Sequence, residues 1–208
     1  MGALVESERY GGADNNSIAA AQSIEASFSS LGGLASRGAV VGSVEAAPSG
    51  TIALIASDSG WYDETGLHTA TNTNYLVGRN TTTKRNFFVF DLTGIDYAIV
   101  SAELQIGNPN SGYSSPDANE TYSVYDVTTP ITALTAGGNG VVGVYGDLAS
   151  GVAYGSQTVN SAANGQVVKV ALNAAAVEML NRQRGVQAAF GGALTTVSGS
   201  TPQYLFGY

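Results

Sequence analysis

The sequence predicts an all-β protein: an antiparallel β-sandwich of the jelly-roll type with one short helix. About nine short stretches rich in β-branched and aromatic residues alternate with turns of Gly, Asn, Ser and Thr, a pattern typical of sandwiches and barrels. The 27 glycines among 208 residues agree with many turns, and a hydrophobic share of 44% is enough for a sizeable core. Only one stretch has the spacing and the end signals of a helix.

The first 48 residues differ in composition from the rest. They contain few aromatic residues and many Ala, Ser and Gly, so we expect residues 1–48 to form an N-terminal extension that packs on the sandwich or extends from it. The turn-forming stretch Ala-Ala-Pro-Ser-Gly at 46–50 leads into the jelly-roll domain, which we place at 49–208. A single domain with an extension suits a chain of this length better than two domains.

The strongest strand prediction is the stretch 85–92, around which the other strands are expected to pack. Five apolar residues, three of them Phe, fall within six positions, and such a short aromatic run indicates a strand buried on both faces. In the stretch 99–106 alternation predicts that Val100, Ala102, Leu104 and Ile106 share one face. The other predicted strands cover residues 39–44, 51–56, 122–128, 141–145, 167–172, 186–190 and 203–208.

One helix is predicted at 174–184. Asn173 is a suitable N-cap and Gly185 a suitable C-terminal stop. Val177 and Leu180 supply its apolar stripe, and Glu178 with Arg182 forms an i,i+4 ion pair on its exposed side.

Composition excludes several kinds of partner and site. The net charge is −8, and the eight Lys and Arg residues are scattered, so we expect neither nucleic acid nor an anionic membrane surface as a partner. The absence of cysteine rules out disulfides, Cys-based metal sites and Cys nucleophiles. No run of 18 apolar residues occurs, so no transmembrane segment is predicted. The opening Met1-Gly2 is interpreted as a start placed on a mature exported protein.

The sequence resembles bacterial exported proteins of the PEP-CTERM class, whose core is similar to the DNRLRE-type, carbohydrate-binding-module-like jelly roll. The resemblance covers roughly residues 51–208 and implies export to the cell surface or the extracellular space, without implying an activity. The Pro-Glu-Pro motif, apolar helix and basic tail of that class do not occur before Tyr208. The motifs that carry the resemblance lie at 58–62, 72–78, 85–92, 100–104, 122–127, 147–155, 172–175 and 206–208.

The residues argue against an enzyme. The only His, His68, lies in a Thr- and Asn-rich loop, and no Gly-x-Ser-x-Gly motif is present, so an exposed loop His is preferred to a Ser-His-Asp triad. A glycosidase needs two carboxylates facing one sugar, and no sequence spacing pairs the available glutamates, Glu64, Glu103, Glu120 and Glu178. We therefore expect a non-catalytic protein.

Acidic loop residues are candidates for a structural Ca²⁺ site. Calcium prefers carboxylate, amide and carbonyl oxygens that converge from loops. One cluster is Asp58, Asp63 and Glu64, a second is Asp117 and Glu120 with Asn119 between them, and Asp14 with Asn16 forms a third. The alternative is that these residues only make turns.

Aromatic residues beside the two longest loops are candidates for binding polysaccharide. Trp61, Tyr62, Tyr75 and Tyr113 lie there, and a sugar-binding site needs exposed flat rings. The alternative for Trp61 is a plug that closes one end of the sandwich. Two functions of comparable weight follow: an extracellular polysaccharide-binding module, or a structural matrix or surface-assembly protein that self-associates through strand edges or its N-terminal segment.

Overall fold

The computed structural model describes residues 4–5, 29–30, 36–37, 40–41 and 50–207. The chain divides into two compact units, Met1–Gly50 and Thr51–Tyr208. The predicted strand at 39–44 contains a described two-residue strand, and the rest of it lies outside the described residues, as do Asp14 and Asn16, the third candidate calcium cluster. The strands described in the first unit are β1 (Leu4–Val5), paired in parallel with β4 (Val40–Val41), and β2 (Ser29–Ser30), paired antiparallel with β3 (Ser36–Arg37).

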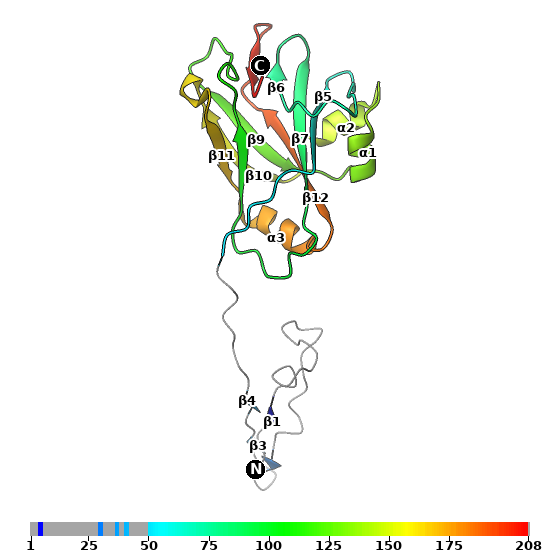
Figure 1. The fold of residues 1–208 in the computed structure, drawn as a ribbon, viewed down its shortest axis with the longest axis vertical. Coiled ribbons are helices and arrows are strands. Elements are labelled where there is room, and N and C mark those ends of the chain that lie inside the picture. Colours follow the sequence, from blue (N-terminus) through cyan, green and yellow to red (C-terminus); the bar gives the residue numbers. More distant parts are fainter. Residues whose placement is uncertain (1–3, 6–28, 31–35, 38–39, 42–49, 208) are drawn as a thin grey trace. The chain divides into compact units, whose positions relative to one another are not determined.

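The second unit is mostly β, and all of its strand pairs are antiparallel (Figure 1). Its larger sheet has seven strands in the order β10-β9-β12-β7-β6-β13, with β5 paired to β7. A second sheet pairs β8 (Glu103–Gly107) with β11 (Val167–Ala171). The strands of the larger sheet are β5 (Asp58–Asp63), β6 (Val77–Arg79), β7 (Thr83–Asp91), β9 (Glu120–Asp126), β10 (Ala153–Val159), β12 (Gln187–Leu194) and β13 (Gln203–Leu205).

Strand β7 contains the Phe-rich stretch and lies between β5 and β12, both of which pair with its residues 86–89. Phe87 and Val89 point to one face of the sheet and Phe88 to the other, and each is at least 94% buried. The prediction of a strand buried on both faces is confirmed. Each such side chain contributes about 1.5–3 kcal/mol on burial, so this strand stabilises two hydrophobic clusters at once.

The first cluster lies between the two sheets. Leu104 and Ile106 of β8 and Val168 and Val170 of β11 are buried, and their neighbours along each strand are exposed. They join Tyr122 and other inward residues of the larger sheet in one cluster. The predicted shared face of Leu104 and Ile106 is therefore confirmed, and β11 shows the same period-2 alternation.

The prediction that residues 99–102 continue β8 is wrong, because Val100 is 88% exposed and the strand begins at Glu103. The side chain of Asn181 takes both backbone groups of Ile99: the Ile99 N–H donates to Asn181 Oδ1 at 2.9 Å, and Asn181 Nδ2 donates to the Ile99 carbonyl at 2.8 Å. With its N–H bound to a helix side chain, Ile99 has no backbone donor left for a strand partner.

The second cluster lies on the outer face of the larger sheet, which two short helices cover. Leu134 of α1 (Ile131–Ala136), Val144 of α2 (Val142–Asp147) and Leu148 pack with Phe87 and Val89. The prediction of a single helix is therefore wrong, and so is the prediction of a strand at 141–145.

Helix α2 is held to the sheet at its C-terminal end by Arg85. The guanidinium donates to the carbonyls of Tyr145 at 2.9 Å and Gly146 at 3.1 Å, and it lies 4.2 Å from the Tyr145 ring centroid. Carbonyls in the last turn have no partner inside a helix, and an Arg side chain satisfies them well. Gly191 of β12 lies against the residue that follows α2. A larger residue would not fit there, because a Cβ would lie 2.6 Å from the Leu148 carbonyl oxygen.

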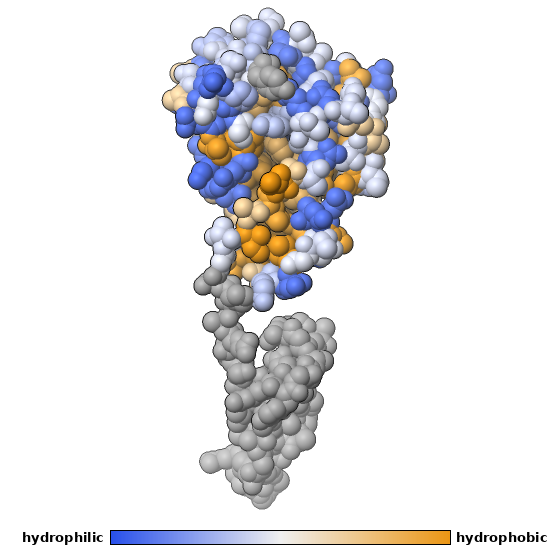
Figure 2. All heavy atoms as spheres, viewed as in Figure 1, coloured by the Kyte–Doolittle hydropathy of each residue, from blue (hydrophilic) through white to orange (hydrophobic). Residues whose placement is uncertain are grey.

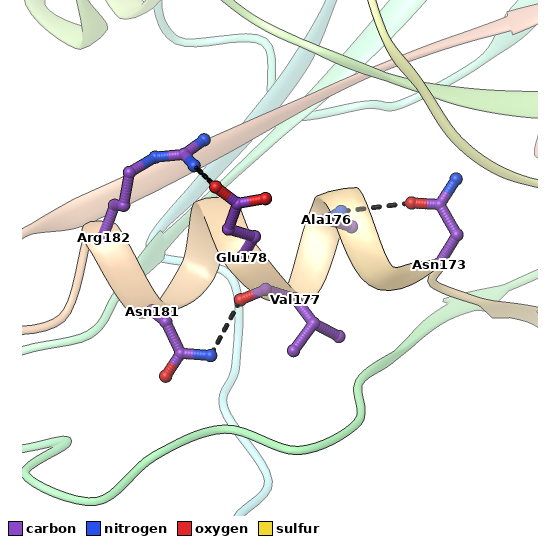
Figure 3. A network of polar contacts seen from close by, with 6 residues as sticks. All are labelled: Asn173, Ala176, Val177, Glu178, Asn181 and Arg182. Carbon is purple, nitrogen blue, oxygen red and sulfur yellow. Dashed lines mark hydrogen bonds and ion pairs between the residues drawn. The ribbon is translucent and has the colours of Figure 1, made fainter.

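The predicted helix is present as α3 (Ala174–Arg182). Asn173 Oδ1 accepts from the Ala176 N–H at 3.1 Å, and the Glu178–Arg182 ion pair is formed at 2.5 Å (Figure 3). The helix ends two residues before the predicted end, and Gln183 is its C-cap. None of the described helices has the length and the hydrophobicity needed to cross a membrane.

Candidate interaction surface

Two of the predicted ligand-binding aromatics are neighbours on β5 and point to opposite faces of the sheet. Tyr62 is fully buried, its hydroxyl donates to the Leu134 carbonyl at 2.8 Å, and burial raises the pKa of that hydroxyl. Trp61 is half-buried, and Lys84 Nζ lies 4.9 Å from its ring centroid. Tyr62 is thus a core residue whose ring has no surface for a ligand, whereas Trp61 is partly accessible at the edge of the sheet.

The other two predicted aromatics, Tyr75 and Tyr113, are half-buried and hold loops in place. The Tyr75 hydroxyl donates to the Gly107 carbonyl at 3.2 Å, and its ring lies 5.4 Å from that of Phe88. The Tyr113 hydroxyl donates to the Asp117 carbonyl at 2.7 Å. Among the described residues no two of the four predicted rings pair with each other, so the structure does not bring them into a shared stack.

The carboxylate of Asp63 closes the turn after β5. It accepts from the Thr65 N–H at 2.9 Å, the Thr65 hydroxyl at 2.6 Å and the Leu67 N–H at 3.0 Å. Burial raises its pKa, but these hydrogen bonds outweigh burial and hold the pKa below its ordinary value. The other two residues of this predicted calcium cluster are not part of the turn network: Asp58 accepts from the Ser59 N–H at 2.7 Å, and Glu64 is exposed.

The second acidic pair also ties loops together. Glu120 is fully buried, and its two oxygens accept from the hydroxyls of Ser115, at 2.6 Å, and Thr196. Asp117 is exposed and accepts from Gln203 Nε2 at 2.6 Å. Within the part of the chain that the structure describes, no three His, Cys, Asp or Glu residues converge as metal ligands do. Calcium binding at these loops stays a prediction.

His68 is a core residue, so the expectation of an exposed loop His is wrong. It is only 4% exposed, its ring lies 4.7 Å from that of Tyr62, and it meets the ring of Phe87 edge-on at 5.3 Å. Burial lowers its pKa, which favours the neutral ring in the folded protein. The loop reaches the core because the His68 N–H and carbonyl both bond to the backbone of Gly138.

The predicted strand at 51–56 is not paired in the described structure, and this prediction is wrong in that respect. Among the described residues the segment has no strand partner, and the first backbone hydrogen bond after it joins the Ser57 N–H to the Val89 carbonyl at 2.7 Å. Its large side chains face water: Ile52 is 62% exposed and Ile55 is 92% exposed. We refer to residues 51–56 as the TIALIA segment, after their sequence.

More apolar side chains are exposed in the second unit, at Tyr97 and Val100 before β8. Val100 lines a shallow hollow of about 500 Å³ together with Leu172 and with Val177 of α3. Figure 2 shows hydrophobic residues gathered on the lower front of this unit, where the ribbon of Figure 1 shows the TIALIA segment running toward β5. The sequence signal for these exposed apolar residues was the composition of residues 51–56 and 99–102, which were predicted as strands and are not strands in the structure.

Comparison of the sequence with protein-family models gives no match, and comparison with curated proteins gives none either. The geometry is therefore the basis for a functional conclusion. Three carboxylates predicted to bind calcium and three aromatics predicted to bind a ligand hold the fold together through hydrogen bonds. The TIALIA segment, in contrast, exposes large apolar side chains, and among the described residues its backbone makes no hydrogen bond before Ser57, although Ala56 packs against the first hydrophobic cluster.

Proposed function

We propose that this protein is a non-catalytic structural component of a cell surface or extracellular matrix and that it works by self-association. The observation that carries the proposal is the exposure of Ile52 and Ile55 in an uncharged segment. Large apolar side chains gathered on a protein surface mark interaction sites, and strand-like stretches left without partners are prone to pair with other chains.

The proposal also specifies the type of β fold and the location of the protein. A β-sandwich of the jelly-roll type is supported by two antiparallel sheets that share one hydrophobic cluster. Export to the surface is supported by the resemblance of residues 51–208 to PEP-CTERM-class proteins and by the lack of cysteine. A low share of charged residues, 12%, also suits a protein that packs densely against copies of itself.

Association is expected to be weak between two molecules and strong in an array. Burying an exposed Ile or Leu side chain contributes about 1.5–3 kcal/mol, and association costs about 4 kcal/mol or more in lost rotation and translation. The few side chains of one segment exceed that cost by a small margin. Many copies on one surface would add their contacts through high effective concentration.

Light scattering of the full chain over a wide range of protein concentrations tests the proposal. The mass should rise above that of one chain as concentration increases, and Ile55→Lys should abolish the rise. Val142→Lys is the matched control, because Val142 is 51% exposed on α2 and receives the same charge. A mass of one chain at every concentration would refute self-association.

A second function, polysaccharide binding, is favoured by one observation. Trp61 is half-buried on β5, which pairs with β7 alone among the described strands and so forms an edge of the described sheet. A partly exposed Trp ring at an edge can stack on a sugar. Retention on immobilised polysaccharides tests this: Trp61→Ala should remove retention and Trp61→Phe should keep most of it, whereas equal retention of the wild type and Trp61→Ala would exclude a role for this ring.

A further inference from the structure

We infer that the TIALIA segment pairs, as an antiparallel β-strand, with the TIALIA segment of a second copy of the chain. The inference rests on the proposed self-association and names the partner and the geometry of that contact. It is carried by the backbone of the segment, by its composition and by the symmetry that its sequence allows.

Within the part of the chain that the structure describes, the backbone groups of residues 51–56 have no hydrogen-bonding partner. Among residues 50–207, no described group donates to or accepts from an N–H or C=O of this segment. Each N–H and C=O is a strong hydrogen-bonding group, and a row of them open to water is what an exposed strand edge presents to another chain. An incoming strand can therefore bind without breaking any described bond of the fold.

The composition of the segment favours strand pairing. Thr-Ile-Ala-Leu-Ile-Ala contains three β-branched residues and no charge, Pro or Gly, which are the properties of six-residue segments that pair with copies of themselves. Edge strands that avoid such pairing carry Lys, Pro or a bulge. The edge strand β10 differs, because its outer stretch is the polar Ser156, Gln157 and Thr158.

Charge and symmetry identify the occupant as a second copy. Residues 50–57 are uncharged, so two chains of net charge −8 can meet there without placing like charges opposite each other. An antiparallel pair of identical strands is related by a two-fold axis perpendicular to the plane of the pair. Both copies then use the same residues for the contact, so the interface is self-complementary and the dimer is closed.

The symmetry also selects a register. Residues opposite each other in an antiparallel pair point to the same face of the sheet, and the two-fold axis keeps each residue on its own face. One residue must therefore lie opposite its own copy, with the axis midway between the two. Centred on Leu54, the pairing places Ile52 opposite Ala56, Ala53 opposite Ile55 and Leu54 opposite its own copy, so every central pair is apolar. Centred on Ala53, it would place the hydroxyl of Thr51 opposite Ile55. We therefore assign the axis to Leu54.

Cysteine cross-linking tests this register, because the chain contains no cysteine of its own. In the assigned register Leu54→Cys faces its copy at roughly 4.5–5.5 Å between Cα atoms, within the range of a disulfide. Ala53→Cys is the matched control: its copy lies on the diagonal at roughly 7–8 Å, out of reach. Under mild oxidation Leu54→Cys should form covalent dimers several-fold faster than Ala53→Cys, and a mixture of Ala53→Cys with Ile55→Cys should form the mixed dimer.

The outcomes separate this inference from the proposed function. If the wild-type mass rises with concentration but Leu54→Cys cross-links no faster than Ala53→Cys, the copies meet elsewhere, and the pairing is overturned while self-association stands. If the mass is that of one chain throughout, both are overturned. Leu54 is 40% exposed, so the Cys variant should fold, and an unchanged melting temperature checks this.

Discussion

Replacing Tyr122 with Phe removes one hydroxyl from the centre of the fold and should destabilise the protein measurably. Tyr122 and Asn86 are both fully buried, and the Tyr122 hydroxyl donates to Asn86 Oδ1 at 2.9 Å. Asn86 Nδ2 in turn donates to the Tyr75 carbonyl at 2.8 Å, so the network joins β9, β7 and the loop before β6. Gly192 leaves space for it, because a Cβ there would lie 2.0 Å from the Tyr122 hydroxyl.

The expected loss follows from leaving a buried acceptor without its donor. In Tyr122→Phe the ring and its packing remain while Asn86 Oδ1 loses a hydrogen bond, which costs about 1–3 kcal/mol. For a unit of this size, each kcal/mol lowers the melting temperature by about 2–4 °C. Urea unfolding followed by the fluorescence of Trp61, the only Trp, gives the free energy of unfolding directly.

Tyr125→Phe is the matched control, because Tyr125 is half-buried on the same strand and its hydroxyl makes no hydrogen bond among the described residues. This control should change the free energy of unfolding by less than about 0.5 kcal/mol. Equal effects of the two substitutions would refute the claim that the Tyr122–Asn86 hydrogen bond stabilises the core.

Three further predictions concern pH and calcium. Burial raises the pKa of Asp147, but hydrogen bonds from Thr128 and Thr129 outweigh burial and hold the pKa below its ordinary value. The stabilisation from this carboxylate is therefore complete above about pH 4 and is lost as the pH falls further. Asp147→Asn should reduce the pH dependence of the free energy of unfolding, measured in urea, below pH 4. Burial lowers the pKa of His68, so stability should fall as the pH drops below about 6.5, because the ring takes up a proton in the unfolded chain at a higher pH than in the folded protein; an equal fall in His68→Phe would contradict this. Millimolar Ca²⁺ should raise the melting temperature if the acidic loops bind it, and an unchanged value would end the calcium prediction.

Sequence reasoning succeeded where local signals decide the structure. The strand at 85–92 is encoded by its own aromatic run, and α3 by the cap Asn173 and the apolar spacing that follows. The buried face of Leu104 and Ile106 in β8 follows from alternation alone. These features depend on neighbours within a few residues, so a single sequence specifies them.

Tertiary contacts decided the elements that were predicted wrongly. The β-branched residues at 141–145 favour a strand locally, but a helix there lets Val144 and Leu148 cover Phe87 and Val89 on the sheet. Packing overrides propensity of this size, which amounts to fractions of a kcal/mol per residue.

The same cause limited the prediction of the site. Alternation along β5 separates Trp61 from Tyr62, but which face is buried depends on α1 and α2, whose packing is not visible in the sequence of β5. The carboxylates of Asp63 and Glu120 were identified as acidic loop residues, and the structure adds that nearby hydroxyls satisfy them. For the TIALIA segment the β-branched composition predicted a strand, but the segment is not a strand in the structure, and its backbone has no hydrogen-bonding partner among the described residues.

Amide hydrogen exchange of the full chain at low and high protein concentration tests the central claim most directly. If the TIALIA segment pairs with its copy, its amides exchange rapidly in dilute solution and alternate amides between Ile52 and Ala56 slow at high concentration, because every second N–H of an antiparallel pair bonds to the partner strand. Amides of β7, which are bonded within the fold, should be protected equally at both concentrations. Rapid exchange of the segment at every concentration would contradict the pairing.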